Sequence, residues 1–215
     1  MSESIIHKYR AVFWDFDGVI LQSNDVRTEG FRHLFRNEDP ELVKQLIQYH
    51  EQNGGLSRYV KIRYFYEVLR KEQVSEERVF QMADTFSVIM REKLVNPQLL
   101  IEDAISYIKA NHDRVPMYVV SGSDEMDLNY LCRQLQIDGY FRAIKGSPTP
   151  KIQLVNTLLQ QEQLIPDQVL LIGDSVNDWE AARLNQIHFA GYNQPGLKGK
   201  GDFYINRLMP ESICQ

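Results

Sequence analysis

Two aspartates that directly follow an apolar run are the residues of this chain best suited to chemistry. The run Ala11–Trp14 is typical of a buried strand, and Asp15 and Asp17 come next, followed by Gly18. Since glycine permits a sharp bend, both carboxylates can share one cleft. Crowded carboxylates repel each other unless a cation or a proton lies between them. The pattern therefore predicts a divalent metal and one carboxylate that is free to attack a substrate or to move protons.

A second pair of acids follows another apolar run. Val169–Ile172 ends shortly before Asp174, and Asp178 lies about one helical turn further on. The two carboxylates can therefore face the same cleft. Hard oxygen ligands of this kind suit Mg²⁺, which binds through few carboxylates and keeps several waters.

A serine and a lysine complete the set of candidate residues. Ser121 and Gly122 follow the apolar run Pro116–Val120, and a hydroxyl with the N–H groups of a strand-to-helix turn can bind phosphate. Lys151 follows two prolines that stiffen its approach, and its ammonium could neutralise a carboxylate and a phosphoryl oxygen together. A helix-capping serine and a surface lysine are the alternative interpretations.

These residues need elements that end at a common edge. Strand-like runs alternate with helix-like runs, and the expected strands are Tyr9–Trp14, Pro116–Val120, Ala143–Ile144, Val169–Ile172, His188–Ala190 and Phe203–Ile205. Helices are expected at Leu99–Ala110, Met126–Leu135 and Ile152–Leu159. The alternation predicts an α/β fold with a parallel sheet, in which ligands bind at the carboxyl ends of the strands.

The stretch 22–95 interrupts this alternation and contains no convincing strand. Its apolar spacing predicts amphipathic helices at Asp25–Arg36, Glu41–Gln52, Arg58–Arg70 and Glu76–Leu94. Asp39-Pro40 and Asn96-Pro97 each resemble an N-cap followed by proline at the first helical position. We therefore expect an inserted all-helical domain at 22–95 and an α/β core domain at 1–21 and 96–215.

Composition bounds the function. The net charge of −5 and a pI near 5.6 argue against general attraction to nucleic acid or membranes. The two cysteines, Cys132 and Cys214, form neither a disulfide framework nor a zinc pattern. The polar start of the chain, 1–10, lacks the apolar segment of a signal peptide. We expect a cytoplasmic protein, whereas its oligomeric state is left open.

The order acid pair, serine, lysine, acid pair resembles the haloacid dehalogenase (HAD) superfamily. Asp15-Phe16-Asp17-Gly18-Val19 resembles its first motif, Ser121 its second, Lys151 its third and Gly173-Asp174-Ser175-Val176-Asn177-Asp178 its fourth. These motifs span 8–21 and 96–207. The insert resembles the C1 cap of phosphoglycolate-phosphatase-like members, so the resemblance implies a Rossmann-like core with a helical cap.

The resemblance also implies a reaction, the Mg²⁺-dependent hydrolysis of a small phosphorylated metabolite. Asp15 would attack phosphorus and form an aspartyl-phosphate, and Asp17 would protonate the leaving oxygen and then activate water. Mg²⁺ would lie between Asp15, the main-chain carbonyl of Asp17 and Asp174. Asp178 would orient a metal-bound water or support the lysine of the third motif.

Ser121 and the N–H of Gly122 would hold phosphate oxygens in such an enzyme, together with Lys151. The third motif departs from the usual Gly-Lys-Pro pattern, so Lys145 competes for this role. An acid at position 17 distinguishes members that act on phosphate esters from dehalogenases and phosphonatases. A phosphomutase acting on a sugar phosphate and a non-catalytic binding or regulatory module are the alternatives.

Within the insert, Gly54-Gly55-Leu56-Ser57-Arg58 looks like a mobile loop that meets a helix. In capped members such a loop contacts the substrate, and Arg58 would suit a carboxylate, a second phosphate or sugar hydroxyls. Arg27 is a weaker candidate. The alternative is that Arg58, Lys61 and Arg63 form a solvated helix face. The lone histidines His33 and His50 are expected at the surface or in packing.

Overall fold

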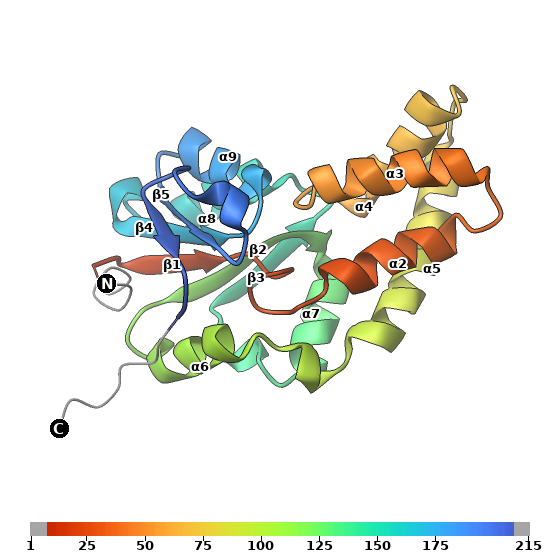
Figure 1. Cartoon of the computed structure of the whole chain (residues 1–215). Coiled ribbons are helices and arrows are strands. Elements are labelled where there is room, and N and C mark those ends of the chain that lie inside the picture. Colours follow the sequence, from red (N-terminus) through yellow and green to blue (C-terminus); the bar gives the residue numbers. More distant parts are fainter. Residues whose placement is uncertain (1–7, 209–215) are drawn as a thin grey trace.

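The computed structural model describes residues 8–208, within which six parallel strands form one sheet (Figure 1). In sheet order the strands are β3 (Ala143–Ser147), β2 (Met117–Asp124), β1 (Ala11–Trp14), β4 (Val169–Gly173), β5 (His188–Tyr192) and β6 (Phe203–Ile205). The predicted parallel α/β sheet is confirmed. Because β1 lies between β2 and β4, the polar residues that follow these three strands meet at one edge.

Helices cover both faces of the sheet. They are α6 (Glu102–Asn111) and α7 (Glu125–Gln134) on one face, and α8 (Lys151–Gln161) and α9 (Val176–Leu184) on the other. Side chains alternate along β1, so Val12 and Trp14 pack with the first pair and Ala11 and Phe13 with the second. Burial on both faces explains why the strands are continuous apolar runs.

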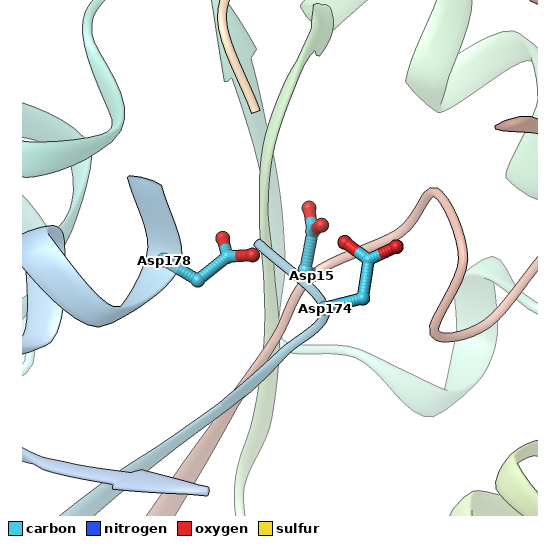
Figure 2. Close-up of side chains that lie close together, drawn as sticks. All are labelled: Asp15, Asp174 and Asp178. Atoms are coloured by element: carbon cyan, nitrogen blue, oxygen red, sulfur yellow. The ribbon is translucent and has the colours of Figure 1, made fainter. Parts of the chain in front are cut away.

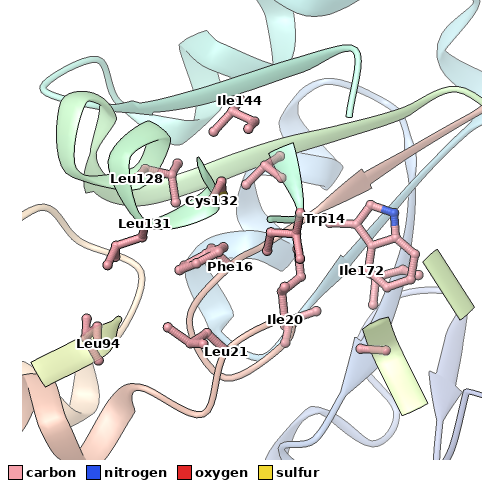
Figure 3. Packing of buried hydrophobic residues seen from close by; sticks show 14 of the residues in the cluster. Trp14, Phe16, Ile20, Leu21, Leu94, Leu128, Leu131, Cys132, Ile144 and Ile172 are labelled. Atoms are coloured by element: carbon pink, nitrogen blue, oxygen red, sulfur yellow. The ribbon is translucent and has the colours of Figure 1, made fainter. Parts of the chain in front are cut away.

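A block of helices, residues 24–94, lies beyond the carboxyl ends of the strands (Figure 1). It consists of α2 (Asn24–Leu34), α3 (Pro40–Gln52), α4 (Arg58–Arg63), the π-helical η1 (Tyr64–Leu69) and α5 (Glu76–Leu94). Figure 3 shows Leu94 from this block near Phe16 and Leu21, which follow β1. One continuous apolar cluster therefore joins the helical block to the sheet.

Two of the predicted helices differ from the structure. The helix expected at Arg58–Arg70 is α-helical only to Arg63 and continues as η1. The helix expected from Pro97 begins at Glu102, because Asn96 caps only a short 3-10 turn by accepting a hydrogen bond from the N–H of Gln98 at 3.0 Å. By contrast, Asp39 accepts hydrogen bonds at the start of α3, as expected.

Strand β2 is longer than its apolar run. It continues through Ser121, Gly122 and Ser123 to Asp124, with a register irregularity against β3 after Val120. The cap of the following helix α7 is Asp124, which accepts hydrogen bonds from two backbone N–H groups. Ser121 is therefore not a helix cap but a residue of the strand.

The described part of the chain gives no sign of a membrane segment, since every helix within residues 8–208 is too short or too polar to cross a bilayer. Cys132 is free and buried in α7, and Cys214 lies outside the described residues. Burial raises the pKa of the Cys132 thiol to about 12. This cysteine therefore acts as a small apolar core residue.

The junction between the helical block and the sheet can be tested by truncation. Leu94 is fully buried in the shared cluster, so Leu94→Ala should lower the free energy of unfolding by about 2–5 kcal/mol. Val88 lies on the same helix but is 66% exposed, so Val88→Ala should change stability by no more than about 0.5 kcal/mol. Urea unfolding measures both, and equal small effects would contradict this packing.

Candidate active site

The ends of β1 and β4 bring three carboxylates together (Figure 2). Asp15 follows β1, Asp174 follows β4, and Asp178 lies in the first turn of α9; each places an oxygen within 4.8 Å of the others. Lys151, the first residue of α8, donates a hydrogen bond to Asp15 at 2.8 Å and contacts Asp178. The lysine is 4% exposed, so its buried ammonium directly contacts two of the three acids.

The charges in this cluster do not balance. Burial, followed by the charge of Asp178, raises the pKa of Asp15 well above its ordinary value, and Lys151 offsets this only in part. Burial and Asp178 likewise raise the pKa of Asp174 to about 7. Burial disfavours the Lys151 ammonium, but Asp15 and Asp178 outweigh burial and raise its pKa. The cluster therefore has room for a further positive charge.

The donor atoms fit a divalent cation. Both oxygens of Asp178 are occupied, one by Lys151 and the other by the N–H and hydroxyl of Ser175 at 3.0 and 2.6 Å. Asp15 and Asp174 each keep one oxygen that makes no hydrogen bond within residues 8–208. Carboxylate oxygens are the ligands Mg²⁺ prefers. This arrangement favours Asp15 and Asp174 as metal ligands, and Asp178 as the residue that holds Lys151.

Asp17 lies in different surroundings. Its Oδ1 accepts hydrogen bonds from Ser23 and from Nε of Arg27 at 2.6 Å, and its Oδ2 accepts one from Ser123 at 2.6 Å. Burial acts to raise the pKa of Asp17, but Arg27 and the two hydroxyls outweigh it and lower the pKa. The environments of Asp15 and Asp17 thus push their pKa values in opposite directions, a pattern typical of carboxylates with different roles.

The Gly54-Gly55 loop of the helical block contacts the strand ends directly. A Cβ on Gly122 would lie 2.2 Å from the carbonyl oxygen of Gly55, and Asn177 donates a hydrogen bond to that oxygen at 2.8 Å. Ser121 is buried and accepts a hydrogen bond from the N–H of Ser123 at 3.1 Å, which leaves its own hydroxyl proton available. The loop therefore closes over the second and fourth motifs.

Arg58 is not on a solvated helix face, and neither is Lys61, because both side chains are buried. Nη1 of Arg58 donates hydrogen bonds to Asp127 on α7 at 2.7 Å and to Ser87 at 2.6 Å. Arg91 binds the other oxygen of Asp127 at 2.7 Å. Arg58 thus joins α4 to α7, and its contact with a substrate stays a prediction.

The two candidate lysines lie apart. Lys151 contacts the carboxylates, whereas Lys145 pairs with Glu125 at 3.3 Å and is partly exposed. The sequence did not indicate the partners of Asp17. Ser23 and Arg27 are one turn apart at the start of α2, a spacing that places them on one helix face, and this was the available signal. Ser123 gave no signal beyond its position next to Gly122.

A cavity of about 460 Å³ separates the strand ends from the helical block. Asp15, Asp17, Asp174 and Ser121 line it from the strand ends, while the helical block contributes a second set of lining residues that includes Arg27, His50, Arg58 and Lys61. Ser121 and the carboxylates of Asp15, Asp17 and Asp174, which were predicted from the sequence, thus share one cavity with basic residues of the insert.

The geometry agrees with a comparison to protein families. The family model described as haloacid dehalogenase-like hydrolase matches residues 12–192. The chain belongs to this family. Members of the HAD family are hydrolases, generally phosphatases, and typically use a divalent metal. A search of the curated proteins finds no match.

Solved structures share the fold at low sequence identity. A β-phosphoglucomutase from Clostridium difficile has a TM-score of 0.72 and 17% identity, covering 95% of this chain and 94% of the other. A predicted phosphoglycolate phosphatase from Haemophilus somnus has a TM-score of 0.70 and 16% identity, covering 94% of this chain and 95% of the other. YfnB of Bacillus subtilis, solved bound to magnesium, has a TM-score of 0.69 and 19% identity, covering 94% of this chain and 96% of the other. At such low sequence identities, these similarities show only that the chain shares the fold.

The close approach of the Gly54-Gly55 loop to Gly122 predicts that a larger residue at position 122 will displace the loop. A methyl group in Gly122→Ala would collide with the Gly55 backbone, and such overpacking costs about 1–3 kcal/mol. The loop should open more often, so amide exchange over residues 53–57 should rise by about tenfold or more. Gly139→Ala is the control, since its Cβ would meet no atom within 4 Å. Unchanged exchange in Gly122→Ala would show that the loop does not rest on β2.

Proposed function

We propose that this HAD-family chain is a Mg²⁺-dependent phosphatase that hydrolyses a small phosphorylated metabolite through an aspartyl-phosphate on Asp15. The observation that carries the proposal is the pair of contacts from Lys151 to Asp15 and Asp178, because Asp15 also lines the cavity together with Asp17. A nucleophile held beside a buried cation, with a second acid in other surroundings, is the arrangement that two-step phosphoryl transfer requires.

The proposed first step uses five groups of the chain. A carboxylate oxygen of Asp15 forms a bond to phosphorus, and the bond from phosphorus to the ester oxygen breaks. Asp17 gives its proton to the leaving oxygen. Lys151, the Ser121 hydroxyl and the N–H of Gly122 hold the phosphoryl oxygens as negative charge develops on them.

In the proposed second step Asp17 is ionised and takes a proton from water, whose oxygen attacks phosphorus. The bond from phosphorus to Asp15 breaks, which releases inorganic phosphate and restores the carboxylate. The low pKa of Asp17, held by Arg27, Ser23 and Ser123, favours this ionised form. The residues that hold Asp17 therefore support its role as the base in the second step, and they act against the protonated form that the first step uses.

The proposed metal site consists of Asp15, Asp174 and the main-chain carbonyl of Asp17. When bound, Mg²⁺ neutralises charge on the carboxylates and on the phosphoryl oxygens. The unbalanced charge of the cluster and the free oxygens of Asp15 and Asp174 support this site. The structure of YfnB bound to magnesium is a further reason to test this metal first.

We further propose that residues 22–95 act as a cap over a core of 1–21 and 96–215. The loop contacts of Gly55 with Asn177 and Gly122 support this division. The proposed partner is a small phosphorylated molecule, since a cavity of about 460 Å³ suits a small ligand; neither nucleic acid nor a membrane is proposed. The proposed location is the cytoplasm, where the Cys132 thiol would stay reduced.

Two substitutions separate the roles of the paired acids. Asp15→Asn should abolish turnover of a generic aryl phosphate with Mg²⁺, since the nucleophile is lost. Asp17→Asn should lower kcat by about 10²–10⁴-fold, the usual contribution of general acid–base catalysis. Asp113→Asn, at a residue whose side chain is 89% exposed, serves as the control. A near-normal rate for Asp15→Asn would contradict the mechanism. With a sugar phosphate as the substrate, an isomerised sugar phosphate in place of free phosphate would also contradict it.

Metal binding should depend on pH. Protonated Asp174 cannot bind a cation, and its pKa is about 7 in the metal-free protein. The apparent affinity for Mg²⁺ should therefore fall by up to about tenfold per pH unit and per carboxyl as pH drops below this value, with proton release on binding. Calorimetry in buffers of different ionisation enthalpy measures both effects. Equal affinity at about pH 6 and about pH 8 would contradict the assignment.

A further inference from the structure

The helical block places a buried lysine without a directly paired acid at the cavity. Lys61 lines the cavity and is 2% exposed. Its Nζ lies 2.8 Å from Nδ1 of His50 and donates to the carbonyl oxygen of Gly54 at 3.4 Å. Within residues 8–208, no carboxylate lies within 4.0 Å of this ammonium. A buried ammonium without an acid is costly, since such charges are normally paired.

His50 does not supply the missing negative charge. Burial, followed by the charges of Lys61 and Arg27, lowers the pKa of His50 to about 3, so the imidazole is neutral and accepts the hydrogen bond from Lys61. The ring of Phe31 packs against His50 at 4.8 Å between centroids, and Nζ of Lys61 lies 5.9 Å from the same ring. These contacts position the amino group of Lys61 but provide no acid that pairs with it directly.

Two arginines add unused donors to the same cavity. Nε of Arg27 binds Asp17 and Nη1 of Arg58 binds Asp127, but Nη2 of each arginine is buried without a partner. Both side chains line the cavity with Lys61. Burial, followed by the charge of Arg27, lowers the pKa of Lys61 to about 7. Burial also lowers the pKa of Arg58, and the charge of Arg27 adds to this effect. Asp25 and Glu51 also line the cavity, but both are exposed.

We infer that Lys61, with the free Nη2 groups of Arg27 and Arg58, forms a second anion site that binds a carboxylate or a second phosphate at the far end of the substrate. The inference rests on the proposed function, because the transferred phosphoryl group occupies the strand ends. It narrows the substrate class to small phosphate esters that carry two separated anionic groups. An anionic tail would supply the charge that Lys61 lacks and the acceptor that each Nη2 lacks.

Binding of non-hydrolysable alkyl phosphonates tests the site without turnover. Three probes of equal chain length end in a hydroxyl, a carboxylate or a second phosphonate, and calorimetry measures their affinity in the presence of Mg²⁺. The wild type should bind one of the anionic probes about 10- to 100-fold more tightly than the hydroxyl probe. The anionic probe that gains more identifies which group the site accepts. Equal affinity for all three probes would overturn the inference.

The same three probes are compared between the wild type and Lys61→Met, because methionine keeps most of the side-chain volume and removes the charge. The gain from the anionic tail should vanish in Lys61→Met and return in part in Lys61→Arg, while binding of the hydroxyl probe is unchanged. Removing a buried unpaired charge should also leave the Tm equal or higher. A gain that survives in Lys61→Met would overturn the site, and so would a lowered Tm with equal loss of all three probes, which would mark Lys61 as a structural residue.

Failure of this inference is distinguishable from failure of the proposed function. If aryl phosphates are hydrolysed but an anionic tail adds no affinity, the inferred second anion site is wrong and the proposed phosphatase activity is supported. If an anionic tail adds affinity that depends on Lys61 but no phosphate ester is hydrolysed, the phosphatase falls and the anion site stands.

Discussion

The site depends on the crowding of buried carboxylates around a single lysine. Parallel pairing of β1 with β4 places Asp15 and Asp174 side by side, and the first turn of α9 adds Asp178. Lys151 balances only part of this charge, so the pKa values of Asp15 and Asp174 are raised. The sheet therefore creates an excess of negative charge that a divalent cation can neutralise.

The helical block completes the electrostatics of the site and does more than cover it. Arg27 and Ser23 from the start of α2 hold Asp17 in its ionised form, opposite in tendency to Asp15. Arg58 is tied to Asp127, whereas Lys61 has only neutral partners. Arg27 thus pairs with Asp17, Arg58 joins the helical block to the sheet layer, and Lys61 is the cation that we infer to bind a ligand.

Residues whose roles follow from local sequence could be predicted, and residues whose roles follow from packing could not. Asp15 and Asp174 directly follow apolar runs, so the parallel sheet and their shared edge were enough to place them together. Nothing local shows that Lys61 is buried or that Arg58 meets Asp127, because those contacts join segments far apart in the chain. The extension of β2 through Ser121 was missed for a related reason, since small polar residues give no strand signal and regular pairing with β3 resumes only at Asp124.

If Asp15 is the nucleophile of this charge cluster, acid quenching during turnover should trap a phosphoryl group on its carboxylate. An aryl phosphate has a leaving group that needs little protonation, so with Asp17→Asn the first step should proceed while water attack is slowed. The variant is mixed with this substrate and Mg²⁺, quenched in acid and mapped by peptide mass spectrometry. The account predicts a phosphoryl group on the peptide that contains Asp15 and none in Asp15→Asn. A phosphoryl group on another residue, or turnover with no covalent adduct, would contradict it.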